Sequence, residues 1–91
     1  MAAFRVVTTP TFNRDFRKTS KGNPILEGAL QELATILAQD PHNRSGVHPI
    51  KLKDIKSGGR WRIRWRQYRL RYDIYGTGVV LHSFRHRKAA Y

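Results

Sequence analysis

The chain has 91 residues, enough for one domain with a modest hydrophobic core and too few for two. Eighteen Lys and Arg residues against six Asp and Glu give a formal net charge of +12, which attracts nucleic acid or an acidic protein. The sequence has no cysteine and no apolar run near the ~20 residues of a membrane span. Disulfides, thiolate catalysis and cysteine-based zinc sites are therefore excluded, and a soluble chain is expected.

The first half of the chain predicts one strand followed by two helices. Residues 4–9 are rich in β-branched side chains and stop at a proline, as a short strand would. Thr11 is expected to cap a first helix that runs to about Lys18. Asn23 precedes a proline and opens a second helix, which ends at Asp40. Four leucines at helical spacing predict the buried side of this second helix: Leu26, Leu30, Leu33 and Leu37.

The second half predicts four strands. Residues 50–53 alternate as a short strand, and a turn follows at 54–59. Residues 60–66 and 68–75 alternate strictly and are joined closely, which is typical of a β-hairpin. After a turn at 76–78, a last strand is predicted over 79–84. It begins with apolar side chains on both of its faces, so it should be a central strand of the sheet. This order predicts an α+β fold, β-α-α-β-β-β-β, with an antiparallel-dominated twisted sheet and both helices on one face.

The predicted hairpin has two contrasting faces. Trp61, Ile63 and Trp65 share one face with Tyr68 and Leu70, which suits a core, whereas the other face is a ladder of arginines. Like charges opposite each other on neighbouring strands cost roughly 0.2–1 kcal/mol each. A solvated face would normally mix Glu, Thr and Lys, so the ladder favours a surface that holds a polyanion. An unusually basic exposed face is the alternative.

The remaining titratable residues limit the chemistry. The four histidines show no ligand-type spacing, the six acids form no cluster, and no glycine-rich phosphate loop is present. Cationic, histidyl and phenolic groups remain. They suit metal-independent RNA cleavage, in which the ribose 2′-OH attacks phosphorus, arginines stabilise the developing charge and a titratable group moves the protons.

Three segments carry a resemblance to a known family. Residues 61–64 (WRIR), 68–72 (YRLRY) and 86–91 (HRKAAY) resemble the RelE/ParE-type toxins of bacterial type II toxin–antitoxin pairs. The stretch from Asp40 to Gly59 is similar to the lead-in that those toxins show. The resemblance covers nearly the whole chain, and it implies a RelE-like toxin domain over residues 1–91 with no cofactor and no metal.

The family divides by function. RelE-like members cut messenger RNA in the ribosomal A site with basic residues on the third and fourth strands and a C-terminal basic or aromatic residue. ParE-like members lack that set and poison DNA gyrase. This chain carries the cleaving set, so the resemblance implies an mRNA interferase. Its expected partners are mRNA, the ribosome (the 30S A site with its 16S rRNA) and a cognate acidic antitoxin, without a membrane.

Two alternatives remain at this point: a ParE-like gyrase inhibitor that cleaves nothing, and a non-enzymatic nucleic-acid-binding module. Residues 1–5 lack the long apolar core of a signal peptide, so the cytoplasm is the expected compartment.

The resemblance also implies roles for individual residues. The expected catalytic set is Arg62, Arg64, Arg69, Arg85, His86 and Tyr91. The first three are expected to hold the scissile and flanking phosphates through paired guanidinium contacts. Arg85 is expected to stabilise the transition state, and His86 to carry protons near neutral pH. Tyr91 would stack on a base or transfer a proton.

Other residues have weaker assignments. Lys51, Lys53, Arg71 and Arg87 are expected to bind the RNA backbone, with solvated side chains as the alternative. His86 as an ordinary surface histidine and Tyr91 as part of a disordered terminus also stay open. Some family members use a sheet glutamate as the base, but both glutamates here fall on the second predicted helix, so histidine or tyrosine must serve.

Overall fold

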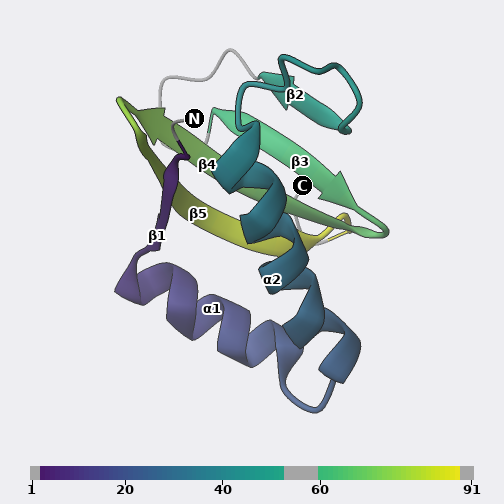
Figure 1. The fold of residues 1–91 in the computed structure, drawn as a ribbon. Helices are drawn as coiled ribbons and strands as arrows, with labels where there is room; N and C mark the ends of the chain where they lie inside the picture. The colour runs from purple at the N-terminus through teal and green to yellow at the C-terminus, as the bar shows by residue number, and fades with distance from the viewer. Residues whose placement is uncertain (1–2, 53–59, 89–91) are drawn as a thin grey trace.

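A computed structural model describes residues 3–52 and 60–88, which form two helices and a five-stranded sheet (Figure 1). The elements in chain order are β1 (Arg5–Thr8), α1 (Pro10–Ser20), α2 (Pro24–Gln39), β2 (Ile50–Leu52), β3 (Trp61–Trp65), β4 (Tyr68–Tyr75) and β5 (Gly78–His86). The predicted α+β order is confirmed. The predicted turn at 54–59 lies outside the described residues.

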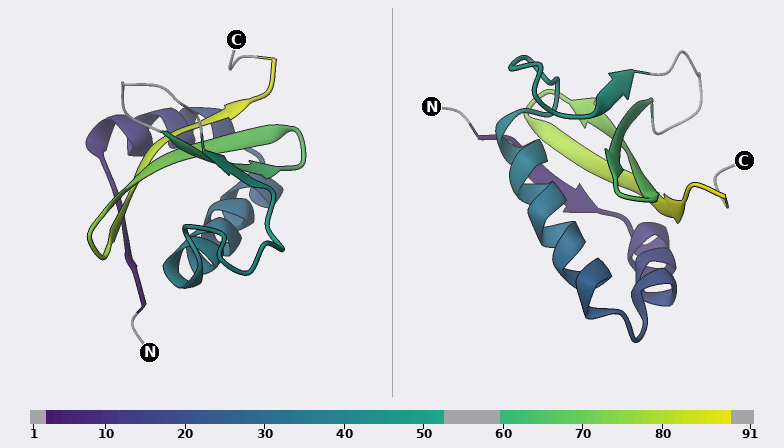
Figure 2. Two further views of the ribbon diagram at one scale, coloured as in Figure 1. Left: turned by 90° about the horizontal axis from the view of Figure 1, so that it is seen from above. Right: turned by 90° about the vertical axis from the view of Figure 1, so that its right-hand side faces the viewer.

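The strands are arranged in the order β1-β5-β4-β3-β2. β1 runs parallel to β5, and the other three neighbouring pairs are antiparallel, so the prediction of an antiparallel-dominated sheet is confirmed. β5 has a strand on each side, which agrees with its apolar start. β1 pairs only as far as Thr8 opposite Leu81, and α1 lies along β5 beyond that point (Figure 1). Figure 2 shows both helices to one side of the sheet, which leaves the other face uncovered by α1 and α2.

Side-chain caps fix where the helices begin. The Oγ1 of Thr9 accepts a hydrogen bond from the backbone N–H of Phe12 at 3.0 Å, and Pro10 occupies the first turn. The prediction of Thr11 as the cap was wrong, since Thr9 stands before a first-turn proline and can reach a free N–H. Asn23 caps α2 as predicted, and its Oδ1 accepts from the N–H of Leu26.

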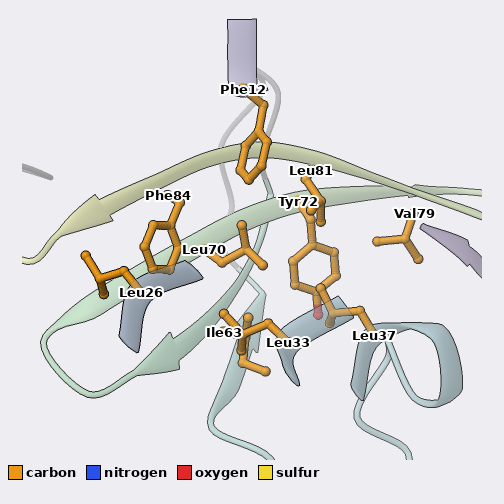
Figure 3. Close-up of a cluster of buried hydrophobic side chains, with 10 residues drawn as sticks. All are labelled: Phe12, Leu26, Leu33, Leu37, Ile63, Leu70, Tyr72, Val79, Leu81 and Phe84. Atoms are coloured by element: carbon orange, nitrogen blue, oxygen red, sulfur yellow. The ribbon is translucent and has the colours of Figure 1, made fainter. Parts of the chain in front are cut away.

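The core lies between the helices and the inner face of the sheet (Figure 3). Phe12 of α1 and three leucines of α2 meet six strand residues: Ile63, Leu70, Tyr72, Val79, Leu81 and Phe84. Leu30 is only half-buried, whereas Ala29 is buried in its place. Trp61 and Trp65 are half-buried and pack against this core, so they lie on the inner face, as their alternation predicted.

Two-residue loops join β3 to β4 and β4 to β5. The first residue of each loop has a positive φ: 54° at Arg66 and 59° at Gly76. Glycine adopts this conformation without strain, but an arginine does not. The guanidinium of Arg66 lies 4.9 Å from the centroid of the Trp65 ring, a cation–π contact that helps to offset the strain at this loop.

The connection from α2 to β2 is ordered by the Asp40 carboxylate. It accepts hydrogen bonds from the N–H of Arg44 at 2.7 Å and from the N–H and hydroxyl of Ser45 at 3.2 and 2.6 Å. The phenol of Tyr72 donates to the carbonyl of Pro41 at 2.7 Å and fastens this connection to β4. Burial, with a smaller effect of Asp40, raises the pKa of that phenol well above its usual value.

We expect Asp40→Asn to destabilise the protein at pH 7 and to have no effect in strong acid. The Ser45 hydroxyl lowers the pKa of Asp40 below its ordinary 3.8, partial desolvation opposes this, and the N–H groups of Arg44 and Ser45 and the nearby His48 lower it further. A depressed folded-state pKa stabilises the fold above the unfolded value and loses that contribution as the pH falls through the folded value. Melting temperatures of both proteins from pH 7 to pH 2 measure this. A difference that persists at pH 2 would mean that the charge is not the cause.

Candidate nucleic-acid interface

The pairing of β2, β3, β4 and β5 aligns basic side chains in two rows on the uncovered face. Residues directly opposite each other share a face, with Cβ atoms roughly 4.5–5.5 Å apart. The first row runs from Lys51 through Arg62 and Arg71 to Ser83. The second row is Arg64, Arg69 and Arg85. We call the six cations of these rows the basic face: Lys51, Arg62, Arg64, Arg69, Arg71 and Arg85.

A β-bulge at His82 brings β5 into this arrangement. Arg71 lies opposite Ser83, but Tyr72 lies opposite Leu81, so His82 is an extra, exposed residue. Strict alternation from Val79 would turn Arg85 towards the helices. The bulge shifts the alternation by one residue, which buries Phe84 and places Arg85 on the basic face.

Basic side chains outnumber carboxylates on the strands that the structure describes. Asp73 follows Arg71 on the same side of β4 and is the one carboxylate that the described strands carry. It is 9% exposed and accepts a hydrogen bond from the backbone N–H of Arg60 at 2.9 Å. Arg62, Arg69 and Arg71 are half-buried, whereas Arg64 and Arg85 are exposed. Six cations aligned by the strand register create a positive field that suits phosphate.

His86 lies on the other face of the sheet. It stands opposite Tyr68 in the ladder, and the two rings meet edge to face at 5.2 Å. Its Nδ1 accepts a hydrogen bond from the backbone N–H of Lys88 at 3.2 Å. This bond favours the neutral tautomer with its hydrogen on Nε2, so His86 presents a donor. The structure therefore places the four predicted catalytic arginines on one face and turns His86 to the other, so that Arg85 is the one member of the rows that reaches the pocket of His86 at the end of β5.

The remaining predicted residues are placed as follows. Lys51 is exposed opposite Arg62, and Arg71 lies between Arg62 and Ser83. The side chain of Arg87 is exposed, and its backbone N–H donates to the carbonyl of Gln67 at 2.7 Å, which fastens the end of β5 to the β3–β4 loop. Lys53 and Tyr91 lie outside the described residues.

Two residues near Arg85 were missed by sequence reasoning. Asp15 of α1 lies with its Oδ2 4.0 Å from Nη2 of Arg85, an exposed ion pair of low energy. Thr19 lies one turn further along α1 beside the same end of β5. Their sequence signal is only that of a polar helix surface, because nothing in the local pattern indicates that α1 takes the place of a strand next to β5.

Within residues 3–52 and 60–88, no three His, Asp or Glu side chains come together in an arrangement that could bind a metal ion. In the same part of the chain, neither helix combines the length and the apolar character needed to cross a bilayer.

Comparison with known proteins gives a match among solved structures. No protein-family model matches the chain, and no curated protein sequence matches it. Among solved structures, the chain is similar to one in the crystal structure of the toxin–antitoxin complex RelBE2 from Mycobacterium tuberculosis. The two are 30% identical with a TM-score of 0.73, and the alignment covers 93% of this chain and 99% of the other.

Arg64→Thr is expected to stabilise the fold while weakening RNA binding. Arg64 is exposed on β3 opposite Arg69, so threonine removes a like-charge pair and suits a strand, a gain of roughly 0.2–1 kcal/mol. Loss of one phosphate contact should reduce the slope of log affinity against log salt by about 0.7 for single-stranded RNA. Urea unfolding and salt titrations with a non-cleavable oligonucleotide measure the two effects.

The matched control is Arg17→Gln, which removes the same charge from an exposed position on α1. It should leave the salt slope nearly unchanged. If Arg64→Thr lowers stability and leaves RNA binding intact, Arg64 serves the fold rather than a ligand.

Proposed function

The chain belongs to the RelE-type toxins of toxin–antitoxin systems, and from that premise we propose that it is a metal-independent endoribonuclease that cleaves messenger RNA. The observation that carries the proposal is the alignment of Arg64, Arg69 and Arg85 in one row across three strands. The parallel row of Lys51, Arg62 and Arg71 lies beside it. Two adjacent rows of cations can bind consecutive phosphates of a single RNA strand. They can also stabilise the negative charge that develops when one of these phosphates is attacked.

The proposed reaction needs no group beyond the RNA and the chain. The ribose 2′-OH gives its proton to a base of the protein and attacks the adjacent phosphorus. The bond to the 5′-oxygen breaks, and that oxygen receives the proton back from the base. The products are a 2′,3′-cyclic phosphate and a 5′-hydroxyl end. Arg62, Arg64 and Arg69 hold the scissile and flanking phosphates, and Arg85 stabilises the charge of the phosphorane. Strands hold these donors in place before the substrate arrives, so little reorganisation opposes the reaction.

His86 and Tyr91 have different roles in this proposal. The Nδ1 of His86 already accepts the N–H of Lys88, so its free nitrogen is a donor as long as that bond persists. His86 is then suited to donate a hydrogen bond to the RNA rather than to take the proton of the 2′-OH. We assign that proton to Tyr91, the remaining titratable group of the catalytic set that the resemblance implies.

The partners in this proposal are the ribosome and an antitoxin. The related RelBE2 structure is a toxin–antitoxin complex, and the +12 charge of this chain suits an acidic inhibitor that covers the basic face. We propose that the free toxin acts in the cytoplasm on mRNA in the ribosomal A site. Gyrase inhibition is the competing function.

Addition of the purified chain to a cell-free translation system should produce new messenger ends at A-site codons. Arg69→Ala should reduce their yield by about 10²–10³-fold, the effect of losing one donor that stabilises developing charge. The yield with Arg69→Lys should lie between that of the unchanged chain and that of Arg69→Ala, because lysine keeps the charge and loses the planar two-point contact. Primer extension measures the ends, and Arg17→Gln is the control. Intact messenger together with stalled gyrase–DNA complexes would refute the nuclease.

The roles of Tyr91 and His86 can be separated by substitution. Tyr91→Phe should lower the cleavage rate by about 10²–10⁴-fold, the range for a lost acid or base. His86→Gln should lower the cleavage rate less than Tyr91→Phe does, because glutamine also offers an N–H donor. Rates from pH 5 to pH 9 should then rise with pH without a step near 6.5, the ordinary pKa of histidine. A larger rate loss with His86→Gln than with Tyr91→Phe, together with a step in rate near pH 6.5, would assign the base to His86.

A further inference from the structure

A pocket opens beside the basic face at the end of the sheet. It has a volume of about 310 Å³, at the lower end of the range for small-ligand sites. Its lining residues come from α1, β4 and β5: Asp15, Thr19, Tyr68, Phe84, Arg85 and His86. Arg85 belongs both to the pocket and to the second row of the basic face. A strand of RNA on that face therefore passes directly beside the pocket.

The inner wall of the pocket is aromatic and fixed. The Tyr68 ring lies parallel to Phe84, with centroids 5.1 Å apart and 2° between the planes. The ring of His86 stands at 87° to Tyr68 at 5.2 Å. Phe84 is buried in the core, whereas Tyr68 and His86 are half-buried, so two of the three rings offer surface to a ligand. Rings held in this way suit stacking of a flat heterocycle.

The opposite wall is polar and comes from α1. Asp15 and Thr19 are four residues apart and therefore lie on one side of the helix. The Oδ2 of Asp15 lies 4.0 Å from Nη2 of Arg85, and its side chain is 36% exposed. Within the described part of the chain, no protein group donates a hydrogen bond to Asp15. Its carboxylate can therefore still accept hydrogen bonds from a ligand.

We propose that this pocket binds one unpaired guanine base of the RNA. The choice of RNA as the source of the base rests on the function proposed above. Guanine carries an N–H in its ring and an amino group beside it, and this pair matches the two oxygens of the Asp15 carboxylate. Arg85 and the Nε2–H of His86 are donors for the acceptors O6 and N7. Single-stranded RNA is commonly recognised through bases splayed out onto aromatic side chains.

The charge of the pocket argues against an acidic peptide as its occupant. The carboxylate of Asp15 would repel a glutamate or aspartate side chain brought to the same wall. Adenine has an amino group but lacks the adjacent ring N–H, and uracil lacks the amino group. Neither can pair both oxygens of the carboxylate from a single edge.

The test uses the full-length chain and the four nucleoside 5′-monophosphates, which contain no bond that the proposed reaction could cleave. NMR titration should show upfield ring-current shifts of the Tyr68 and His86 protons with guanosine monophosphate, and weaker binding of the other three. Asp15→Asn should reduce guanosine monophosphate affinity by about tenfold, the effect of losing a charged acceptor at a partly exposed site. Glu27→Gln is the matched control, because it removes one carboxylate from an exposed position on α2 and should change nothing.

Two results would overturn the guanine site. One is equal binding of all four nucleotides that Asp15→Asn leaves unchanged. The other is a set of shifts confined to the basic face, which would mean that only the phosphate binds. A second variant, Thr19→Val, reports on the same wall if Asp15→Asn fails to fold. Arg69→Ala should lower the cleavage yield as predicted above and keep the guanine response, so a failed nuclease assay and a failed guanine assay are separate outcomes.

Discussion

The register between β3, β4 and β5 is the constraint on which the rest of the molecule depends. One set of cross-strand pairs buries Ile63, Leu70 and Phe84 and, on the alternate residues, aligns the arginines. A slip of one residue would expose the core and bury guanidinium groups, which is far more costly than repulsion between exposed arginines. The energy of the apolar face therefore holds the basic face in a geometry that its own charges oppose.

This dependence explains why the arginines of the two rows stay aligned despite their like charges. Neighbouring arginines would separate in a flexible segment, but each is attached to a strand whose other face is anchored by fully buried side chains such as Leu70 and Tyr72. The carboxylate of Asp73 accepts the backbone N–H of Arg60, and that of Asp15 lies beside Arg85.

Strict alternation was sufficient to predict the hairpin, the apolar face with Trp61 and Trp65, and the arginines on the other side, because the period of a strand is a local property. The bulge at His82 was not predicted, although the odd spacing of Leu81 and Phe84 indicates one. That omission concealed how Arg85 joins the rows while His86 turns away. Asp15 and Thr19 were also beyond prediction, since their position depends on where β1 ends beside β5.

The end of β5 is consequently a junction between two surfaces. Arg85 faces the basic rows, and the next residue, His86, faces the helix side, so consecutive residues serve opposite sides of one strand. β1 pairs with β5 only as far as Leu81, so it does not reach the end of β5. Polar side chains of α1 lie beside that end instead of a paired strand. A nucleic acid strand can therefore lay its phosphates on one face and turn a base over the edge to the other. In the proposed complex, Arg85 serves both phosphate binding and base recognition, and the position of His86 on the helix side of β5 suits base recognition.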